Sequence, residues 1–362
     1  MSRIVISGYY GFANAGDEAM LTAIIGSLLQ EDPQLQVTVI SGSPARTAAK
    51  HGVLSVHRFS FFRIIQALRK SDLLLSGGGS LLQDITSRQS LLYYLSIICL
   101  GRLLGKRTML YAQGIGPIRS TCLRWLTKLV CNTVDVITVR DGDSLRELQR
   151  LGVKAGQLEL TADAVFNLSP APRDLGHKLL AAKGITPDQR IVGIAIRQWP
   201  CQRDYLRELA AAADQLVEAE KVKIVLLPLQ QPRDREACEA LRALLRHPQE
   251  AIIINETLDT REYLSLIGNF CCLVGMRLHA LIFAAVMHVP FAALSYDPKI
   301  DGFIKEVNGV NLGKIDSVGR QEIFSAMLQM LGGGSQDFQA LEALRAKAQC
   351  NTKKAIALIR RP

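Results

Sequence analysis

An arginine and a histidine two positions apart follow a glycine in the second half of the chain. The segment reads Gly275, Met276, Arg277, Leu278, His279. The planar guanidinium of Arg277 suits a phosphate or carboxylate, and the imidazole of His279 exchanges protons near neutral pH. The alternative is an exposed arginine beside a packed helix histidine, so the choice depends on the surrounding chain.

Two further cations follow predicted strands in the same half. Arg197 ends the apolar run 191–196, and Lys299 follows the run 291–296 after a short loop. The carboxyl ends of parallel strands meet at one edge of a sheet, where open α/β folds bind ligands. We therefore expect Arg197 and Arg277 to share a small dianion. Lys299 is either a third cation of that site or a solvated loop lysine.

Polar and glycine-rich turns follow four predicted strands of the first half. They are Asn14 to Asp17, Gly77 to Ser80 with Gly78 and Gly79, Gln113 to Pro117, and Arg140 with Asp141. Consecutive glycines let a backbone approach a ligand closely. Asp17 is either the N-cap of the next helix or an acceptor and general base for a sugar hydroxyl. Each turn has a structural explanation, but together they place polar groups along one sheet edge.

The first loop lacks the spacing of a dinucleotide-binding loop. Its glycines stand at positions 8, 11 and 16, and the second predicted strand ends in Ser41 and Gly42 instead of an acidic ribose ligand. Asp17 and Glu18 would also repel a phosphate at the helix N-terminus. We expect no nicotinamide or flavin cofactor, and no cluster of side chains indicates a metal.

Short β-branched runs and amphipathic segments alternate along the chain, which predicts parallel sheets covered by helices. The first half is predicted to have strands 3–7, 36–41, 54–58, 72–76, 108–112 and 135–139, and helices 17–29, 61–70, 90–104, 121–132 and 144–151. The second half is predicted to have strands 191–196, 223–229, 251–255, 270–274 and 291–296, and helices 203–219, 234–245, 260–268, one from about 278, and a last one at 339–360.

Two breaks in this alternation divide the chain. A Leu-Ser-Pro-Ala-Pro stretch lies within 167–173, and the glycines from residue 332 predict a flexible joint, 332–335. We predict a first domain at residues 1–168, a second at 174–331 and a C-terminal helix at 336–362.

The composition is that of a globular protein with acidic partners. The 362 residues are 48% hydrophobic, 21% charged and carry a formal net charge of +10. Cations are spread along the chain, so nucleic acid is not indicated. The eight cysteines form no CxxC pair, which favours a reduced cytoplasmic protein. No apolar run reaches the ~20 residues that span a bilayer.

Residues 58–70 combine aromatic side chains with cations at helical spacing. Such a segment could rest on an anionic bilayer. The commoner explanation is a helix that covers the core and exposes a solvated basic face.

Taken in order, the first loop, the Gly77–Ser80 turn, Gln113 to Pro117, Arg140-Asp141 and Gly275-x-Arg277-x-His279 resemble the polysaccharide pyruvyl transferase family, particularly its bacterial CsaB type. The resemblance covers about residues 3 to 330. It implies a GT-B-like α/β fold: two Rossmann-like, doubly wound domains facing a cleft, with a C-terminal helix packing back.

The resemblance also implies an activity. Family members transfer a pyruvyl unit from phosphoenolpyruvate, their co-substrate, to a sugar, forming a ketal and releasing phosphate. For the CsaB type the acceptor is similar to an N-acetylmannosamine residue of a lipid-linked cell-wall precursor, which implies work in the cytoplasm, at the inner face of the cell membrane.

The resemblance assigns roles to individual residues. His279 matches the general acid, and Asp17 could accept a proton from the hydroxyl. The donor-binding residues are Arg197, Arg277 and Lys299, with Arg197 placed only by its position after a strand. The acceptor-binding residues are Asn14, Asp17, Gly78, Gly79, Gln113 and Arg140.

Two other classes stay open. A GT-B glycosyltransferase with a nucleotide-sugar donor would share the fold, but it would want an acidic ribose ligand where Arg277 and His279 stand. A non-catalytic module that binds an anionic glycan or a membrane would not need Asp17, Arg277 and His279 together.

Overall fold

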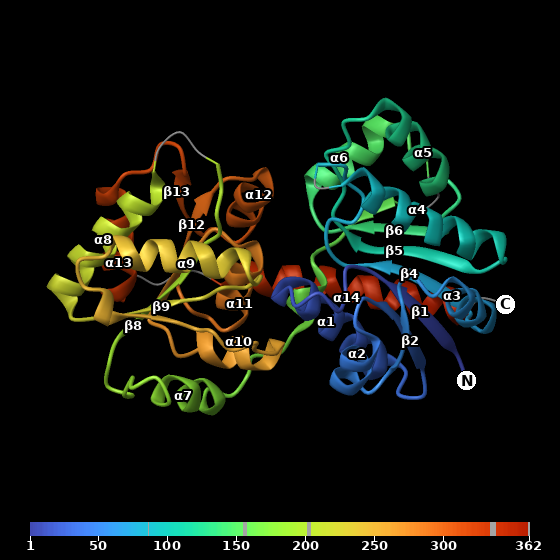
Figure 1. The fold of residues 1–362 in the computed structure, drawn as a ribbon. Coiled ribbons are helices and arrows are strands. Elements are labelled where there is room, and N and C mark those ends of the chain that lie inside the picture. The colour runs from blue at the N-terminus through green and yellow to red at the C-terminus, as the bar shows by residue number, and fades with distance from the viewer. Residues whose placement is uncertain (86, 155–157, 201–203, 334–337, 361–362) are drawn as a thin grey trace. The chain divides into compact units, whose positions relative to one another are not determined.

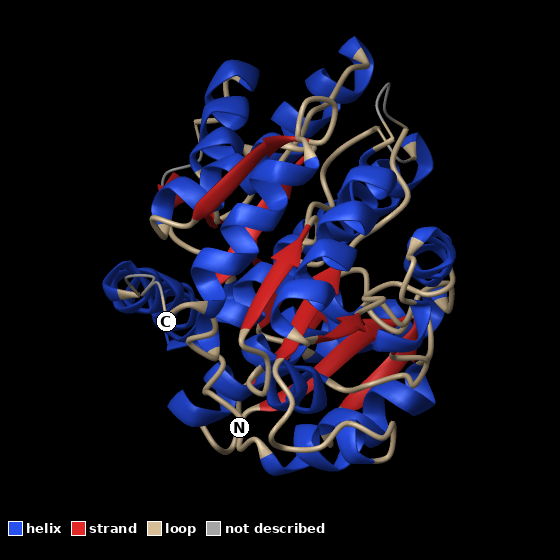
Figure 2. Cartoon of the chain, turned by 90° about the vertical axis from the view of Figure 1, so that its left-hand side faces the viewer, coloured by secondary structure: helices blue, strands red, loops and turns tan. Residues whose placement is uncertain are grey.

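The structure, a computed structural model, describes residues 1–85, 87–154, 158–200, 204–333 and 338–360. The chain forms two compact units, one of residues 1–168 with 343–362 and the other of residues 169–342. In each unit a parallel sheet is flanked by helices (Figures 1 and 2).

The first unit, unit 1, contains a seven-stranded sheet in the order β3-β2-β1-β4-β5-β6-β7. Its strands are β1 (Arg3–Ser7), β2 (Gln36–Ser41), β3 (Leu54–His57), β4 (Leu73–Gly77), β5 (Arg107–Gln113), β6 (Val136–Val139) and β7 (Leu158–Leu160). Its helices are α1 (Ala15–Glu31), α2 (Pro44–His51), α3 (Phe61–Lys70), α4 (Arg88–Leu103), α5 (Thr121–Cys131), α6 (Gly142–Leu151), the 3₁₀ turn η1 (Ala164–Asn167) and most of α14 (Gln339–Arg360).

Alternation along β1 explains how unit 1 is layered. Successive side chains of a strand point to opposite faces. Ile4 and Ile6 pack with residues of α1 and α14. Val5 packs instead with Ile64 of α3 and Ile97 of α4. Because apolar side chains stand on both faces, the sheet is buried from both sides, as parallel sheets are.

Helix α14 returns to unit 1 after the chain has formed unit 2. The Thr352 hydroxyl lies 2.6 Å from that of Tyr111, and Thr161 donates to the Asn351 side chain over 2.8 Å. Both pairs are buried. The predicted packing of a C-terminal helix back onto the fold is therefore confirmed.

The second unit, unit 2, contains a six-stranded sheet in the order β10-β9-β8-β11-β12-β13. Its strands are β8 (Ile191–Ala195), β9 (Lys223–Leu226), β10 (Ala251–Ile253), β11 (Cys272–Gly275), β12 (Phe291–Ser295) and β13 (Val310–Lys314). Its helices are α7 (Asp174–Ala181), α8 (Tyr205–Glu220), α9 (Arg233–Leu244), η2 (Pro248–Glu250), α10 (Thr260–Ile267), α11 (Leu278–Val286), α12 (Pro298–Glu306) and α13 (Arg320–Leu331).

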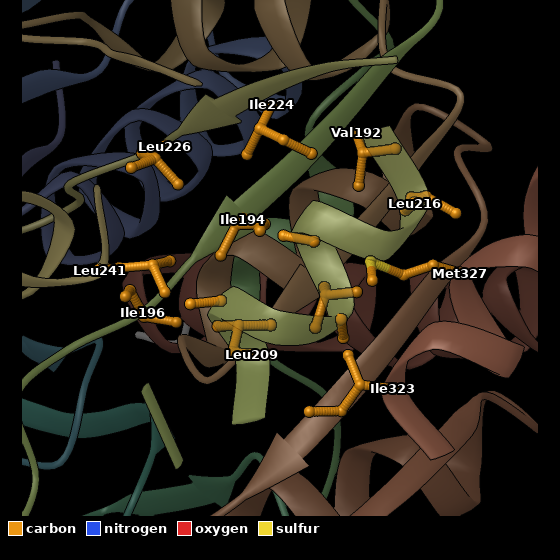
Figure 3. Packing of buried hydrophobic residues seen from close by; sticks show 14 of the residues in the cluster. Val192, Ile194, Ile196, Leu209, Leu216, Ile224, Leu226, Leu241, Ile323 and Met327 are labelled. Carbon is orange, nitrogen blue, oxygen red and sulfur yellow. The ribbon is translucent and has the colours of Figure 1, made fainter. Parts of the chain in front are cut away.

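One face of the second sheet packs around α8. Ile194 of β8 and Ile224 of β9 point into the same cluster as Leu209 of α8 and Ile323 of α13 (Figure 3). These side chains are less than 2% exposed. This dry core holds the strands whose carboxyl ends carry the candidate site.

In both sheets the order in which strands are added reverses beside the first strand of the unit. In unit 1 the switch lies between β1 and β4, and in unit 2 between β8 and β11. At such a switch the two connections leave to opposite sides, which opens a crevice at the carboxyl ends where ligands bind. The loop after β1, the turn after β4, Arg197 and Arg277 all follow strands that flank these two points.

The structure contains elements that the sequence patterns did not predict: α2, α7, α12, α13, β7 and β13. The predicted strand 223–229 ends earlier, at Leu226, and 270–274 shifts to Cys272–Gly275. The start of the predicted helix 203–219 and part of the joint 332–335 lie outside the described residues.

Candidate functional site

Arg277 stands at the N-cap of α11, directly after β11. Its φ of −90° and ψ of 115° are extended, so the side chain leaves the helix axis at the carboxyl edge of the sheet. Gly275 ends the preceding strand in close packing, because a Cβ there would lie 3.1 Å from the Leu281 side chain and would require it to shift by a few tenths of an ångström. Strand and helix thus pack closely and aim the arginine at the edge.

A buried carboxylate holds the Arg277 guanidinium. Arg277 Nε donates to Asp234 Oδ2 over 2.8 Å, and Nη2 donates to Asp234 Oδ1 and, over 3.0 Å, to Gln230 Oε1. Asp234, in α9, is 0% exposed, and its Oδ2 also accepts from the amides of Leu229 and Gln230. Two-point pairing fixes the guanidinium plane.

This fork leaves part of Arg277 available. The side chain is 13% exposed. No hydrogen bond from a described residue involves Nη1. The pair with Asp234 therefore orients Arg277 and neutralises its charge, and leaves Nη1 without a hydrogen bond to a described residue.

Arg197 continues from β8, the neighbour of β11. The Met276 amide donates to the Ala195 carbonyl over 2.8 Å, so the two chain segments leave the sheet side by side. The guanidinium of Arg197 lies 5.5 Å from the centre of the Tyr296 ring, and Nη1 donates to the Tyr296 hydroxyl over 3.3 Å. Tyr296 follows β12, so Arg197 reaches across the end of β11.

Arg197 is supported by aromatic rings, whereas Arg277 is supported by a carboxylate. Trp199 and Tyr296 are in contact, with ring centres 4.5 Å apart, and Arg197 lies over both. No ion pair of Arg197 with a described carboxylate is present. A cation on aromatic faces keeps its full charge for an anion.

His279 and Lys299 lie in the first turns of neighbouring helices. His279 is the second residue of α11, and Lys299 is the second residue of α12, whose N-cap Asp297 accepts from the Lys299 amide over 3.0 Å. Both side chains are partly buried. Since β11 and β12 pair directly, both residues belong to the edge that carries Arg277.

In unit 1 the corresponding edge is built around Arg140. Arg140 follows β6, is 8% exposed, and donates from Nη1 to Asp163 over 2.7 Å and from Nη2 to the Ser80 hydroxyl over 3.2 Å. Burial works to lower the pKa of Arg140, but the Asp163 and Asp141 carboxylates outweigh it and hold that pKa above its ordinary value. Arg140 is therefore a buried permanent cation.

Gln113 and the glycine turn close this edge. Gln113 is fully buried and donates from Nε2 to the Gly79 carbonyl over 2.8 Å. Gly78 and Gly79 both have a φ of +75°, and a Cβ on Gly79 would lie 2.9 Å from Asp17 Oδ1. The Asp17 carboxylate and the Gly79 backbone are thus in close approach, which only glycine permits.

Asn14, and not Asp17, is the N-cap of α1. Its side chain accepts from the Gly16 amide over 3.1 Å, while Asp17 lies inside the first helical turn. Glu18 accepts from the Gly11 amide over 2.8 Å and so ties down the preceding loop. The capping interpretation of Asp17 is wrong, and Asn14 already has a structural task.

The structure therefore gathers the predicted residues in two sets. Asp17, Gly79, Gln113 and Arg140 form the unit 1 set, and Arg197, Arg277, His279 and Lys299 share the unit 2 edge. Asp234, Gln230, Tyr296 and Asp163 were not predicted. For Asp234 a signal existed, because it follows a predicted strand, as the other site residues do.

No group of His, Cys, Asp and Glu side chains in the described ranges is arranged to hold a metal ion. None of the described helices is both long and apolar enough to cross a membrane.

Two solved structures share this architecture over almost the whole chain. The UDP-GlcNAc 2-epimerase of Methanocaldococcus jannaschii has a TM-score of 0.69 at 13% identity, covering 99% of this chain and all of that one. A putative UDP-N-acetylglucosamine 2-epimerase of Listeria monocytogenes has a TM-score of 0.65 at 12% identity, covering 99% and 95%. These likenesses establish the fold alone. The protein has a GT-B-like fold with two parallel-sheet α/β units, as predicted.

The family follows from the sequence comparison. The family model described as polysaccharide pyruvyl transferase matches residues 14–298. The amylovoran biosynthesis protein AmsJ of Erwinia amylovora is 18% identical over 402 residues, covering 96% of this chain and 95% of AmsJ. The chain belongs to the polysaccharide pyruvyl transferase family. This confirms the predicted family, while the CsaB type stays a prediction.

Proposed function

We propose that the protein forms a pyruvate ketal on a sugar, with phosphoenolpyruvate as the donor and phosphate as the leaving group. Arg277 carries the proposal: a guanidinium held at a topological switch point by Asp234, beside the aromatic-supported Arg197. Two arginines on adjacent strand ends suit a compact anion with both a phosphate and a carboxylate.

The charge balance of the unit 2 edge supports this donor. Asp234 cancels the charge of Arg277, so Arg277 contributes direction more than attraction. Arg197, which lies on aromatic rings, supplies the positive charge that draws the donor in, and Lys299 lies at the same edge. As phosphate leaves, charge develops on its oxygens, and fixed cations stabilise such charge without reorganising.

His279 is the proposed acid. Its proton goes to the methylene carbon of phosphoenolpyruvate, leaving a cationic carbon at C2 that a sugar hydroxyl attacks. That hydroxyl passes its proton to a phosphate oxygen as it bonds to C2, the C2–O bond to phosphate breaks, and a second hydroxyl of the sugar closes the ketal and returns a proton to His279. Positioned proton transfer of this kind contributes about 10²–10⁴-fold.

The acceptor is proposed to bind unit 1. The Gly78–Gly79 turn offers backbone at close range, and the Asp17 carboxylate offers acceptors for hydroxyl or amide hydrogens. The buried Gln113 side chain holds the Gly79 carbonyl and so positions the turn. Arg140 braces this edge through Asp163 and Ser80. We propose N-acetylmannosamine on a lipid-linked cell-wall precursor as the acceptor, met at the inner face of the membrane.

Phosphate release with phosphoenolpyruvate and a lipid-linked N-acetylmannosamine acceptor tests the proposal. We expect acceptor-dependent phosphate and a new ketal methyl signal by NMR in the product. Omission of acceptor and replacement of phosphoenolpyruvate by UDP-sugars are the controls. Turnover of a nucleotide sugar without pyruvyl transfer would instead identify a glycosyltransferase.

A further inference from the structure

The net positive charge of the protein comes from one stretch of unit 1, where acidic residues are scarce. Residues 33–134 contain thirteen Lys and Arg against two Asp, a net charge of +11. The whole chain has 43 against 33, so all remaining residues together hold 30 against 31, a net charge of −1. A surface of one sign on an otherwise neutral protein indicates an anionic partner.

The two acids in this stretch are already used by the backbone. Asp72 accepts from the Arg3 amide over 2.8 Å, and Asp84 accepts from the Arg119 and Ser120 amides over 2.8 Å each. No Asp or Glu occurs from residue 85 to 134, which includes all of α4 and α5.

Helices α3, α4 and α5 of this stretch cover the same face of the sheet. Ile64 of α3 and Ile97 of α4 pack together with Val5. Leu95 of α4 and Leu123 of α5 share the neighbouring core cluster. The three helices therefore form one layer whose opposite side is turned to solvent.

That outer side carries large apolar side chains. We define the apolar-basic face by seven exposed residues: Phe59 (73% exposed), Phe61 (59%), Phe62 (87%), Leu92 (44%), Leu103 (84%), Trp125 (61%) and Leu129 (45%). Exposed cations stand among them, namely Arg63, Arg69, Lys70, Arg88 and Lys128. On α3 the inner positions are Ile64 and Leu68, and the exposed positions combine Phe61 and Phe62 with Arg63, Arg69 and Lys70.

The start of α3 is anchored to α4. Arg58 lies 4.4 Å from the centre of the Tyr93 ring and 5.0 Å from that of Phe59, and the Tyr93 hydroxyl donates to the Arg58 carbonyl over 3.0 Å. This stack holds Phe59 at the surface while Phe61 and Phe62 follow in the first turn of α3. The aromatic residues are thus presented by a fixed support.

We propose that the apolar-basic face docks unit 1 on an anionic lipid bilayer. Aromatic and leucine side chains enter the headgroup boundary, and Lys and Arg around them pair with anionic lipids. Nucleic acid would use the cations and the aromatic rings, but it would give no reason for the exposed leucines Leu92, Leu103 and Leu129. A second copy of the chain would bring two faces of the same sign together. This surface is independent of the proposed pyruvyl transfer.

Co-sedimentation of the full chain with vesicles tests the docking. We expect binding to phosphatidylcholine vesicles containing about 30% phosphatidylglycerol, little binding to pure phosphatidylcholine, and weakening by salt. Replacement of Phe61 and Phe62 by Ser should weaken vesicle binding about tenfold or more, because two aromatic side chains no longer enter the bilayer.

Matched variants elsewhere in the chain test whether loss of any exposed leucine or any cation has the same effect on vesicle binding. Leu328→Ser removes an exposed leucine of α13 in unit 2 and should leave vesicle binding unchanged. Lys70→Gln with Arg69→Gln should remove the preference for anionic lipid, whereas Arg235→Gln in α9 should not. Equal binding by wild type and the Phe61/Phe62 variant overturns the proposal. The proposal is also overturned if light scattering shows that the wild type is a dimer, the Phe61/Phe62 variant is a monomer, and neither protein binds vesicles.

Discussion

The two units present the same strand order at their switch points, but they equip the edge differently. Unit 1 brings backbone close to its ligand side through glycines at positive φ, and encloses its arginine, Arg140, among Asp163, Asp141 and Ser80. Unit 2 projects arginines, one on a carboxylate fork and one on aromatic rings. The same scaffold thus serves either for close backbone approach or for presenting cations.

The comparison also separates two uses of an ion pair. Arg140 and Asp163 are 7% and 5% exposed in their side chains, and this pair holds the edge together. Arg277 is 13% exposed over a fully buried Asp234, and its Nη1 makes no hydrogen bond to a described residue. The larger exposed fraction of Arg277 suits its proposed role in donor binding, and the smaller one of Arg140 suits a brace.

The largest difference between the two units is expected on substitution of His279, the proton donor proposed for unit 2. His279→Ala should lower kcat by about 10²–10⁴-fold, because only the transition state receives the proton. The affinity for phosphoenolpyruvate, measured by calorimetry, should change little. His247→Ala, at a partly exposed histidine paired with Glu218 in the same unit, is the control. An unchanged kcat in His279→Ala would remove His279 from the chemistry.

Arg277→Ala should weaken phosphoenolpyruvate binding by about 10²-fold, since charge-assisted hydrogen bonds are lost. It should also lower the free energy of unfolding by roughly 3–5 kcal/mol, because Asp234 is left buried without its partner. Arg277→Met combined with Asp234→Asn should restore much of the stability but not the binding. Recovery of binding in the double variant would show that Arg277 is a brace like Arg140.

Arg140→Met tests the brace in unit 1. Loss of the partner of Asp163 should lower the free energy of unfolding by roughly 3 kcal/mol in urea titrations, with phosphoenolpyruvate affinity unchanged. Arg124→Met is the matched control, since Arg124 is 35% exposed in its pair with Glu147 and should cost less than about 1 kcal/mol. Equal losses in both variants would contradict a buried structural role for Arg140.

The smallest effect is expected at Gly79. Gly79→Ala forces an alanine into a φ of +75° and places its Cβ against Asp17, which should cost about 1–2 kcal/mol and raise the KM for the acceptor. Gly26→Ala in α1, where a Cβ would contact nothing, should stabilise by about 0.5–1 kcal/mol. A stabilised Gly79→Ala protein would show that close backbone approach is not required there.

Sequence patterns predicted the interior of the fold better than its margins. The strand 36–41 is rich in β-branched residues and ends where predicted. The edge strand β13 was missed because Asn311 and Gly313 have low β-propensity and its residues are largely exposed. Helix α12 had a usable signal, since Asp297 and Pro298 are a typical N-cap and first helical residue.

The sequence predicted those site residues that directly follow strands. It did not predict which side chains form ion pairs with one another. Arg197, Arg277 and Arg140 could be placed by the ends of apolar runs. Asp234 lies 43 positions before Arg277, and their pairing depends on β9 and β11 lying on opposite sides of β8. The contact between Thr352 of α14 and Tyr111 was likewise not predictable, because it forms only when a distant part of the chain returns to unit 1.

That return has a consequence for synthesis on the ribosome. The strands of unit 1 emerge first, but the helix that covers Tyr111 and Thr161 emerges only after residues 169–342 have been made. At 5–20 residues per second this interval is roughly ten to thirty seconds. During it, α1 covers its part of this sheet face, but the part that α14 covers lacks its permanent cover. The first unit to begin folding is thus the last to finish.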